Sequence, residues 1–369
     1  MPPTPQPEDD LDAIAPPQPV FHVEQALLGA LLLEPHRLGD VTGIAADSFS
    51  TAAHAALYAA ISALPPPDPT AHAQNTAWLD RVLATAREQA RGLTASYLHT
   101  LIQVCPWPRH APSYARMVEA EHARHRVQKA AEHLIQTAQD TSLPDPVPSV
   151  LAEADALGAV VDDIANRFPP RAGVLPRTAV PPPVPRGDGE AVEEEQLLLA
   201  TATAHPASIE SVRWLLPDDL TLPLHSGLWQ CLTALDRRHE AIDPVTVLWE
   251  AQQRGLLDDG SDPRDVIRLL AEPAGSLDYW GERTLQRSLL ATVEQVGRRI
   301  EAYAGNPAFQ LVVGARRSLA DIAAIRTRWQ QATGPVPTAR PRPTPPARAG
   351  PPTTTAAIAR TARAPRATR

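Results

Sequence analysis

The sequence predicts an all-α protein made of two tandem helical domains, and its composition, an internal repeat and the placement of its prolines support this prediction. Hydrophobic residues make up 43% of the 369 residues but aromatic residues only 4%, so the cores must be built mainly from Ala, Leu, Val and Ile. Alanine and leucine favour helices, whereas the residues that favour strands are comparatively few.

An internal repeat indicates that one fold is used twice. Residues 23–64 align without a gap with residues 194–235. The same alignment pairs Glu24 with Glu195, His54 with His225 and, further along, Trp78 with Trp249. After a shorter loop in the second copy, Tyr114 matches Tyr279.

Local signals in each copy predict a small head followed by a helical hairpin. In the second copy, Asp243 is a good N-cap, Pro244 takes the first helical position and Gly255 is expected to end the helix. Each copy then ends in two longer helical stretches, at 113–137 and 150–168 in the first and at 276–304 and 310–329 in the second. A helix, a short breaker and a second helix are typical of an αα-hairpin.

The 41 prolines divide the chain into five parts, because they crowd the two ends and the segment between the copies. Such stretches are typical of linkers and disordered ends. The expected parts are a disordered N-terminus at 1–19, a first helical domain at 20–168, a Pro-rich linker at 169–190, a second helical domain at 191–333 and a disordered basic tail at 334–369.

The net charge of −8 is unevenly distributed, because the tail carries seven arginines and no acidic residue. We therefore expect any contact with DNA to come from the tail rather than from the acidic body. These arginines are Arg340, Arg342, Arg348, Arg360, Arg363, Arg366 and Arg369. No apolar run reaches the roughly 18 residues of a membrane span and no secretory signal is visible, so we expect a soluble, cytoplasmic protein.

The sequence offers no candidate for ATP hydrolysis, for a cofactor or for a metal ion. A phosphate-binding loop needs a lysine directly after a glycine, and the only lysine, Lys129, has no glycine near it. We therefore expect no ATPase or unwinding activity. His122, His125 and His133 with Glu121 are interpreted as a solvated helix face, because they lack the His-Glu-x-x-His spacing of zinc proteases.

Two further sets of residues have both a structural and a functional interpretation. His54 and His225 could act as acids, bases or ligands. Because we identify no second histidine or carboxylate at a matching spacing in both copies, we expect a structural role inside each head. Trp107 and the pair Tyr279 and Trp280 are either exposed anchors for a partner or ordinary core residues.

Several short motifs define the two heads. The first copy shows Glu24-Gln25-x-Leu27-Leu28, Asp47-x-Phe49, His54-x-x-Leu57-Tyr58 and Ser-Tyr-Ala-x-x-Val-Glu at 113–119, and the second shows Ile-Asp-Pro-Val-Thr at 242–246 and Gly-Leu-Leu at 255–257. Together they resemble the N-terminal domain of DnaB-type replicative DNA helicases. In that family the domain is all-helical, forms dimers through its hairpin, serves as a docking surface for primase and other replication proteins, and does not itself hydrolyse ATP.

The resemblance implies a non-catalytic interaction protein of DNA replication, with a replicative helicase, a primase or another replisome protein as its partner. The alternative is a DNA-binding protein that acts through its Arg-rich tail and uses the helical domains only for assembly. A third possibility is an enzyme whose chemistry leaves no trace in the motifs above.

Two hairpins in one chain predict either an intramolecular pseudo-dimer or a homo-oligomer. The linker has 21 residues from Pro169 to Gly189, and at about 3.1 Å per residue it could span on the order of 60 Å. Tethering raises the local concentration of one hairpin near the other to roughly the millimolar range. The candidate interface residues are Val150, Leu157, Val161, Ile164 and Phe168 in the first hairpin and Val312, Leu319, Ile322, Ile325 and Trp329 in the second.

Overall fold

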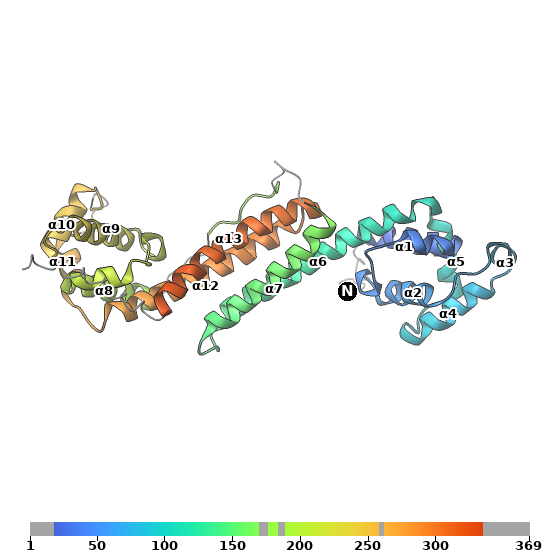
Figure 1. Cartoon of the computed structure of the whole chain (residues 1–369), viewed down its shortest axis with the longest axis horizontal. Helices are drawn as coiled ribbons and strands as arrows, with labels where there is room; N and C mark the ends of the chain where they lie inside the picture. The colour runs from blue at the N-terminus through green and yellow to red at the C-terminus, as the bar shows by residue number, and fades with distance from the viewer. Residues whose placement is uncertain (1–17, 170–175, 184–188, 258–261, 335–369) are drawn as a thin grey trace, which may run out of the picture. The chain divides into compact units, whose positions relative to one another are not determined.

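The structure of the protein is a computed structural model that describes residues 18–169, 176–183, 189–257 and 262–334. Within these ranges it contains thirteen α-helices, five short 3-10 helices and no β-strand, which confirms the predicted all-α class (Figure 1). None of the described helices is both long and apolar enough to cross a membrane. The N-terminal segment 1–17 and the tail arginines, for which we predicted disorder, lie outside the described residues.

The first head surrounds a helix that is buried on nearly all sides. Its elements are α1 (Pro19–Leu33), η1 (Pro35–Asp40), η2 (Ala46–Ser48), α2 (Ala52–Ala63), α3 (Pro69–Gln74), α4 (Ala77–Gln89), α5 (Ala95–Val104) and η3 (Pro108–His110). Leu27, Leu28 and Leu31 of α1 are fully buried, because α2, α5 and the first hairpin helix all pack around it. Thr51 begins α2 by accepting a hydrogen bond from the backbone N–H of His54, as expected of an N-cap.

The second head repeats this plan with α8 (Gly189–Ala204), η4 (Pro206–Val212), η5 (Pro217–Asp219), α9 (Pro223–Arg238), α10 (Pro244–Gln253) and α11 (Pro263–Ala271). Asp243 caps α10 by accepting hydrogen bonds from the backbone of Val245 and Thr246, as the sequence predicts. Gly255, just after α10, has a φ of 71°, a conformation that glycine adopts without strain.

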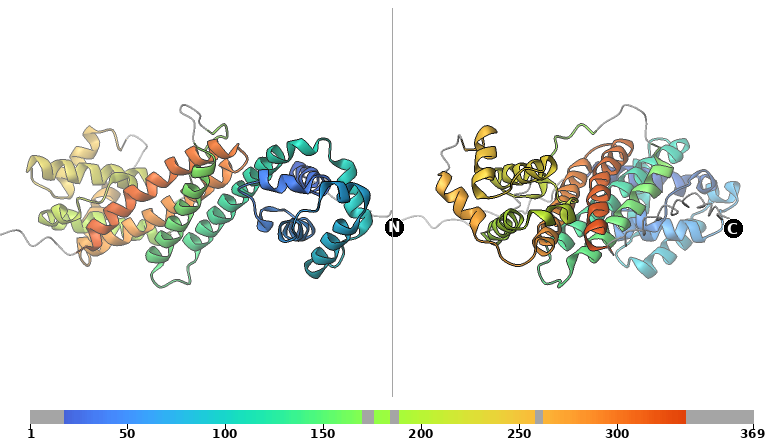
Figure 2. Two further views of the ribbon diagram at one scale, coloured as in Figure 1. Left: turned by 45° about the vertical axis from the view of Figure 1, so that its right-hand side comes forward. Right: turned by 60° about the vertical axis from the view of Figure 1, so that its left-hand side comes forward.

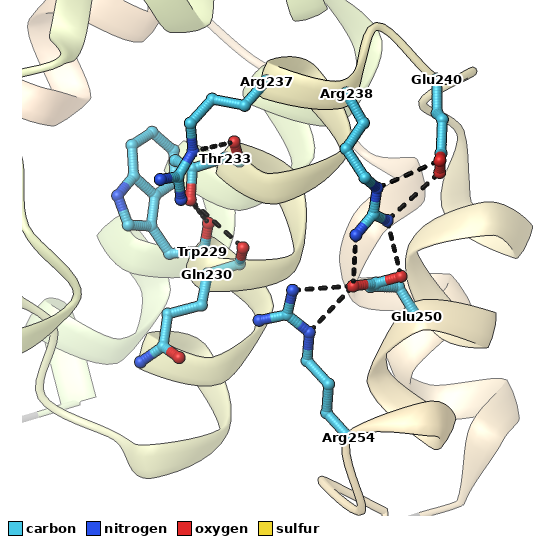
Figure 3. A network of polar contacts seen from close by, with 8 residues as sticks. All are labelled: Trp229, Gln230, Thr233, Arg237, Arg238, Glu240, Glu250 and Arg254. Carbon is cyan, nitrogen blue, oxygen red and sulfur yellow. Dashed lines mark hydrogen bonds and ion pairs between the residues drawn. The ribbon is translucent and has the colours of Figure 1, made fainter.

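The turn between α9 and α10 is fixed by charge. Glu250 of α10 accepts hydrogen bonds from Arg238 at the end of α9 and from Arg254 (Figure 3). These two guanidinium groups hold the pKa of Glu250 below its usual range. The pairs are solvent-exposed, so they orient the turn more than they stabilise it.

The four longest helices form the two hairpins. They are α6 (Ala111–Gln139) and α7 (Pro146–Arg167) in the first copy and α12 (Leu277–Tyr303) and α13 (Ala308–Thr333) in the second. Figures 1 and 2 show the four helices side by side. One apolar cluster runs through both hairpins and the second head, while the first head has an apolar cluster of its own.

The alignment of Trp78 with Trp249 does not hold in three dimensions. Trp78 is 5% exposed at the start of α4, where its indole N–H donates to the carbonyl of Pro65. Trp249 is 66% exposed in the middle of α10. The described residues 239–243, between α9 and α10, contain no counterpart of α3, which precedes α4 in the first copy, so the shorter connection shifts the register of the next helix.

A buried histidine–glutamate pair occurs in each head and corrects our expectation that no carboxylate accompanies the shared histidine. The Nδ1 atom of His54 lies 2.6 Å from Glu24, and that of His225 lies 2.7 Å from Glu195. In both heads the same carboxylate also accepts a hydrogen bond of 2.7 Å from a backbone N–H at the start of the next helix, that of Ser50 or Thr221. The pair therefore fastens α1 to α2 and α8 to α9.

We predict that Glu195→Gln lowers the free energy of unfolding by about 3 kcal/mol, because it leaves one partner of a buried pair uncompensated. Burial raises the pKa of Glu195, but the hydrogen bonds from His225 and Thr221 lower it by more than burial raises it. The pKa of Glu195 therefore lies below its usual value. The carboxylate thus contributes its full stability above about pH 4.3 and loses it as the pH falls through the lowered pKa.

Urea unfolding of both proteins between pH 7 and pH 3 checks this prediction. The difference between wild type and Glu195→Gln should shrink toward acid pH, while Glu193→Gln, an exposed change on the same helix, should unfold like wild type throughout. A difference that stays constant down to pH 3 would contradict it.

Candidate protein-interaction site at the paired hairpins

Each hairpin helix packs against its counterpart from the other copy. Helix α6 lies along α12, where the side-chain amide of Gln139 donates to Glu294 at 2.7 Å. A Cβ atom added to Gly297 would lie only 2.5 Å from Ile135, so the two backbones approach closely at this point. Because the higher number on α6 meets the lower number on α12, the two helices run antiparallel.

The second helices of the hairpins meet in the same way. Asp162 of α7 pairs with Arg316 of α13 at 2.7 Å, and Asp155 pairs with Arg326 at 2.8 Å, so α7 and α13 are also antiparallel. Gly158 lies between the two aspartates and lines a groove of about 410 Å³ between the helices. Like helix meets like helix, which is the arrangement of an isologous, two-fold interface.

The two hairpins bury equivalent faces. The buried positions of α7 and α13 correspond in sequence as Val147 with Ala308, Val150 with Leu311, Ala154 with Ala315, Leu157 with Ser318, Val161 with Ile322 and Ile164 with Ile325. This shared pattern follows a helical period, as expected for one amphipathic helix used twice.

All ten residues that the sequence suggested for the interface lie in or against one apolar cluster. Seven are buried: Val150, Leu157, Val161, Ile164, Val312, Ile322 and Ile325. The other three, Phe168, Leu319 and Trp329, are partly buried and pack on the cluster from its edge. Burial of such side chains contributes about 1.5–3 kcal/mol each, far more than the exposed ion pairs beside them.

An arginine at the end of each hairpin joins it to its own head. Arg167 of α7 donates to the backbone carbonyl of Gly43, and Arg328 of α13 donates to that of Trp214. Gly43 and Trp214 are equivalent in the repeat, so this clamp is present in both copies. In the second copy Arg328 also pairs with Asp219, a buried carboxylate that accepts a second hydrogen bond from Ser288. These clamps were not predicted from the sequence, although Arg167 and Arg328 occupy matching positions in the two hairpins and could have indicated them.

Part of the linker packs on the second hairpin rather than spanning free solvent. Asn306, between α12 and α13, is 5% exposed, and its side-chain Oδ1 accepts a hydrogen bond of 3.0 Å from the backbone N–H of Arg177. Its amide donates to the hydroxyl of Thr178 at 2.7 Å, and Gln295 donates to the carbonyl of Pro181. Residues 176–183 therefore form a strap along α12 and α13, which we call the linker strap.

The remaining sequence candidates are placed as follows. Trp107 is exposed and lies 4.9 Å below the guanidinium of Arg109, whereas Trp280 is half-buried against the head and its neighbour Tyr279 is exposed. The histidines of α6 face different partners: His125 pairs with Glu121, and His133 with Glu153 of α7. In the parts of the chain that the structure describes, no three His, Cys, Asp or Glu side chains are grouped to hold a metal ion. The seven tail arginines lie outside those parts.

Each copy thus consists of a helical head followed by a helical hairpin. The family model of the DnaB-like helicase N-terminal domain matches residues 15–120 and again 188–279. The chain therefore belongs to the DnaB-like helicase N-terminal domain family and contains this replication-related domain twice. Each match covers a head and ends early in its first hairpin helix. No curated protein and no solved structure matches the chain.

We predict that Asn306→Ala and Thr178→Ala each release the linker strap and speed trypsin cleavage between Arg177 and Thr178. Asn306 makes two side-chain hydrogen bonds to the strap, each worth about 1 kcal/mol, so its loss should speed cleavage roughly tenfold or more, and that of Thr178 less. Mass spectrometry of the early fragments identifies the site that is cut. Asn166→Ala, an exposed asparagine of α7, is the matched control and should be cut like wild type. Equal cleavage of all four proteins would rule out a bound strap.

Proposed function

We propose that this chain is a non-catalytic interaction protein of DNA replication that presents two helicase-type N-terminal domains as one intramolecular pseudo-dimer. Each domain consists of a head and its hairpin, at residues 20–168 and 191–333. The paired hairpins form the body, and the outer surfaces of the heads and hairpins dock a replicative helicase, a primase or another replisome protein.

The observation that carries this proposal is the packing of like helix on like helix within a single chain. An αα-hairpin with an apolar stripe on its outer face must cover that stripe, and a second hairpin of the same kind covers it symmetrically. The linker strap supports pairing within the chain, because Asn306 holds the connecting segment against the second hairpin.

A role without catalysis is favoured by the residues present. The 369 residues contain one lysine, Lys129, and it lies on α6 with no glycine beside it. In each of the two buried histidine–glutamate pairs, the side chains hydrogen-bond to each other and fasten helices together. The chemistry of unwinding would then come from the partner.

We predict that cysteines placed at Asp162 and Arg316 crosslink within one chain. The side chains at these two positions meet between α7 and α13. A short bismaleimide should therefore join the two cysteines at low protein concentration without forming a covalent dimer. The background replaces Cys105 and Cys231, and the readout is electrophoresis combined with light scattering. The two single-cysteine proteins can crosslink only between chains and should stay unjoined. Products found only as covalent dimers would show that the hairpins pair between chains.

Two glycine substitutions in this background provide a matched comparison. Gly297→Val places side-chain atoms where α6 approaches α12 and should abolish the crosslink. Gly158→Ala meets no neighbouring atom within 4 Å and should keep it, with about 0.5–1 kcal/mol of added stability from the better helix former.

The alternative function, DNA binding through the Arg-rich tail, has its own test. Seven arginines can neutralise about seven phosphates, so binding at low salt should fall steeply as salt rises. We expect the full chain to bind a DNA duplex at low salt and a chain ending at Thr333 to bind it at least tenfold more weakly in fluorescence anisotropy. Equal binding by the two proteins would remove the tail from any account of the function.

A further inference from the structure

The second head contains a groove that none of the contacts described above uses. It lies between α8, the start of α9 and α11, and has a volume of about 620 Å³, within the usual range of ligand sites. Its floor is apolar and its rim is acidic. The floor consists of Leu197, Leu224, Val266 and Leu269, and the rim of Glu193, Asp262, Asp265 and Glu272, with Arg268 as the one basic residue among the described residues that line it.

In the first head two aromatic side chains pack on the shared histidine, and neither has an aromatic counterpart in the second head. The ring of Phe21 stacks on His54 with the ring centres 4.9 Å apart, and the hydroxyl of Tyr97 lies 2.6 Å from Nε2 of the same histidine. Tyr97 is the third residue of α5, and Asp265 is the third residue of α11. Phe21 is replaced by Val192 in the repeat.

The fold of the head does not require the aromatic side chains that pack on the histidine in the first head. Both heads keep the buried pair of His54 with Glu24 or His225 with Glu195, and His225 is as deeply buried as its counterpart. The second head therefore folds around the same pair while leaving apolar side chains at the bottom of an open groove. Exposed apolar surface rimmed by polar groups is typical of a binding site.

We infer that this groove is the docking site for a basic amphipathic helix of a partner protein. Leu197, Leu224 and Leu269 are half-buried and offer an apolar bed for a stripe of large side chains spaced three and four residues apart. The four rim carboxylates face one arginine, which already pairs with Asp265 at 3.0 Å, so the rim attracts Lys or Arg on the helix flanks. The same charges repel nucleic acid and anionic lipid. This site does not depend on pairing of the hairpins.

Fluorescence anisotropy with the full chain tests the inference. The probe is a labelled synthetic peptide of about sixteen residues, with Leu and Phe along one helical face and Arg on the other. The reference is a peptide of the same composition in shuffled order, which retains the charge but has no stripe. The amphipathic peptide should bind at least tenfold more tightly than the shuffled one. Equal binding of the two, or no binding of the amphipathic peptide, would overturn the inference.

Two tyrosine substitutions locate the site. Asp265→Tyr restores the residue type found in the first head and should fill the groove, so we expect the peptide affinity to fall at least tenfold. Glu210→Tyr is the matched control, because both carboxylates are 66% exposed and each pairs with an arginine three residues later at 3.0 Å. Glu210 lies outside the groove, and its variant should bind like wild type.

A rim variant keeps the test independent of packing. Glu272→Lys is an exposed change beyond the end of α11, and it should weaken peptide binding and reduce its dependence on salt. If both Asp265→Tyr and Glu272→Lys bind the peptide as tightly as wild type, the peptide is not bound in this groove.

Discussion

The apolar seam between the two hairpins constrains most of the remaining structure. A two-helix hairpin can bury only the faces that its own helices turn toward each other, so a second apolar stripe stays open to water until another element covers it. Here the cover is the matching hairpin, and Gly297 lets α12 approach α6 closely enough for Ile135 to pack against its backbone. Once the four helices are in contact, the ends of α7 and α13 are fixed, and with them the two arginine clamps that reach the heads.

Within each head, a buried ionisable pair takes the place of additional apolar packing. Ala-rich helices such as α2 offer little bulk, and a carboxylate with three hydrogen-bond donors can hold a helix start that small side chains cannot. A fully satisfied buried network of this kind rigidifies a core. The two heads share this pair but differ around it: aromatic rings pack on the histidine in the first head, and the second head has an acidic groove between α8 and α11.

The helical layout could be predicted because its signals are local. Asp243 caps its helix, prolines begin or precede helices, and Gly305 to Pro307 separate the last two, all within a few residues of the structure they determine. The histidine–glutamate pair was missed because its partners lie on different helices, although both recur at the same spacing in the repeat. Composition predicts that the linker is extended, but only the fold shows that Asn306 binds it. Periodicity predicted the apolar faces of the hairpins, whereas their pairing was expected from the presence of two hairpins in one chain and left open between pairing within the chain and pairing between chains.

Gly297 has a further consequence. Its counterpart in the first copy is Glu132, so the close approach of α6 and α12 is made by a glycine on one side only. In a homodimer, every residue of the interface occurs twice, and a partner protein finds two identical binding sites. When one chain carries both copies, each copy can change in sequence independently, so the two sides of the paired hairpins need not be identical. A protein that contacts the paired hairpins therefore meets different side chains on their two sides.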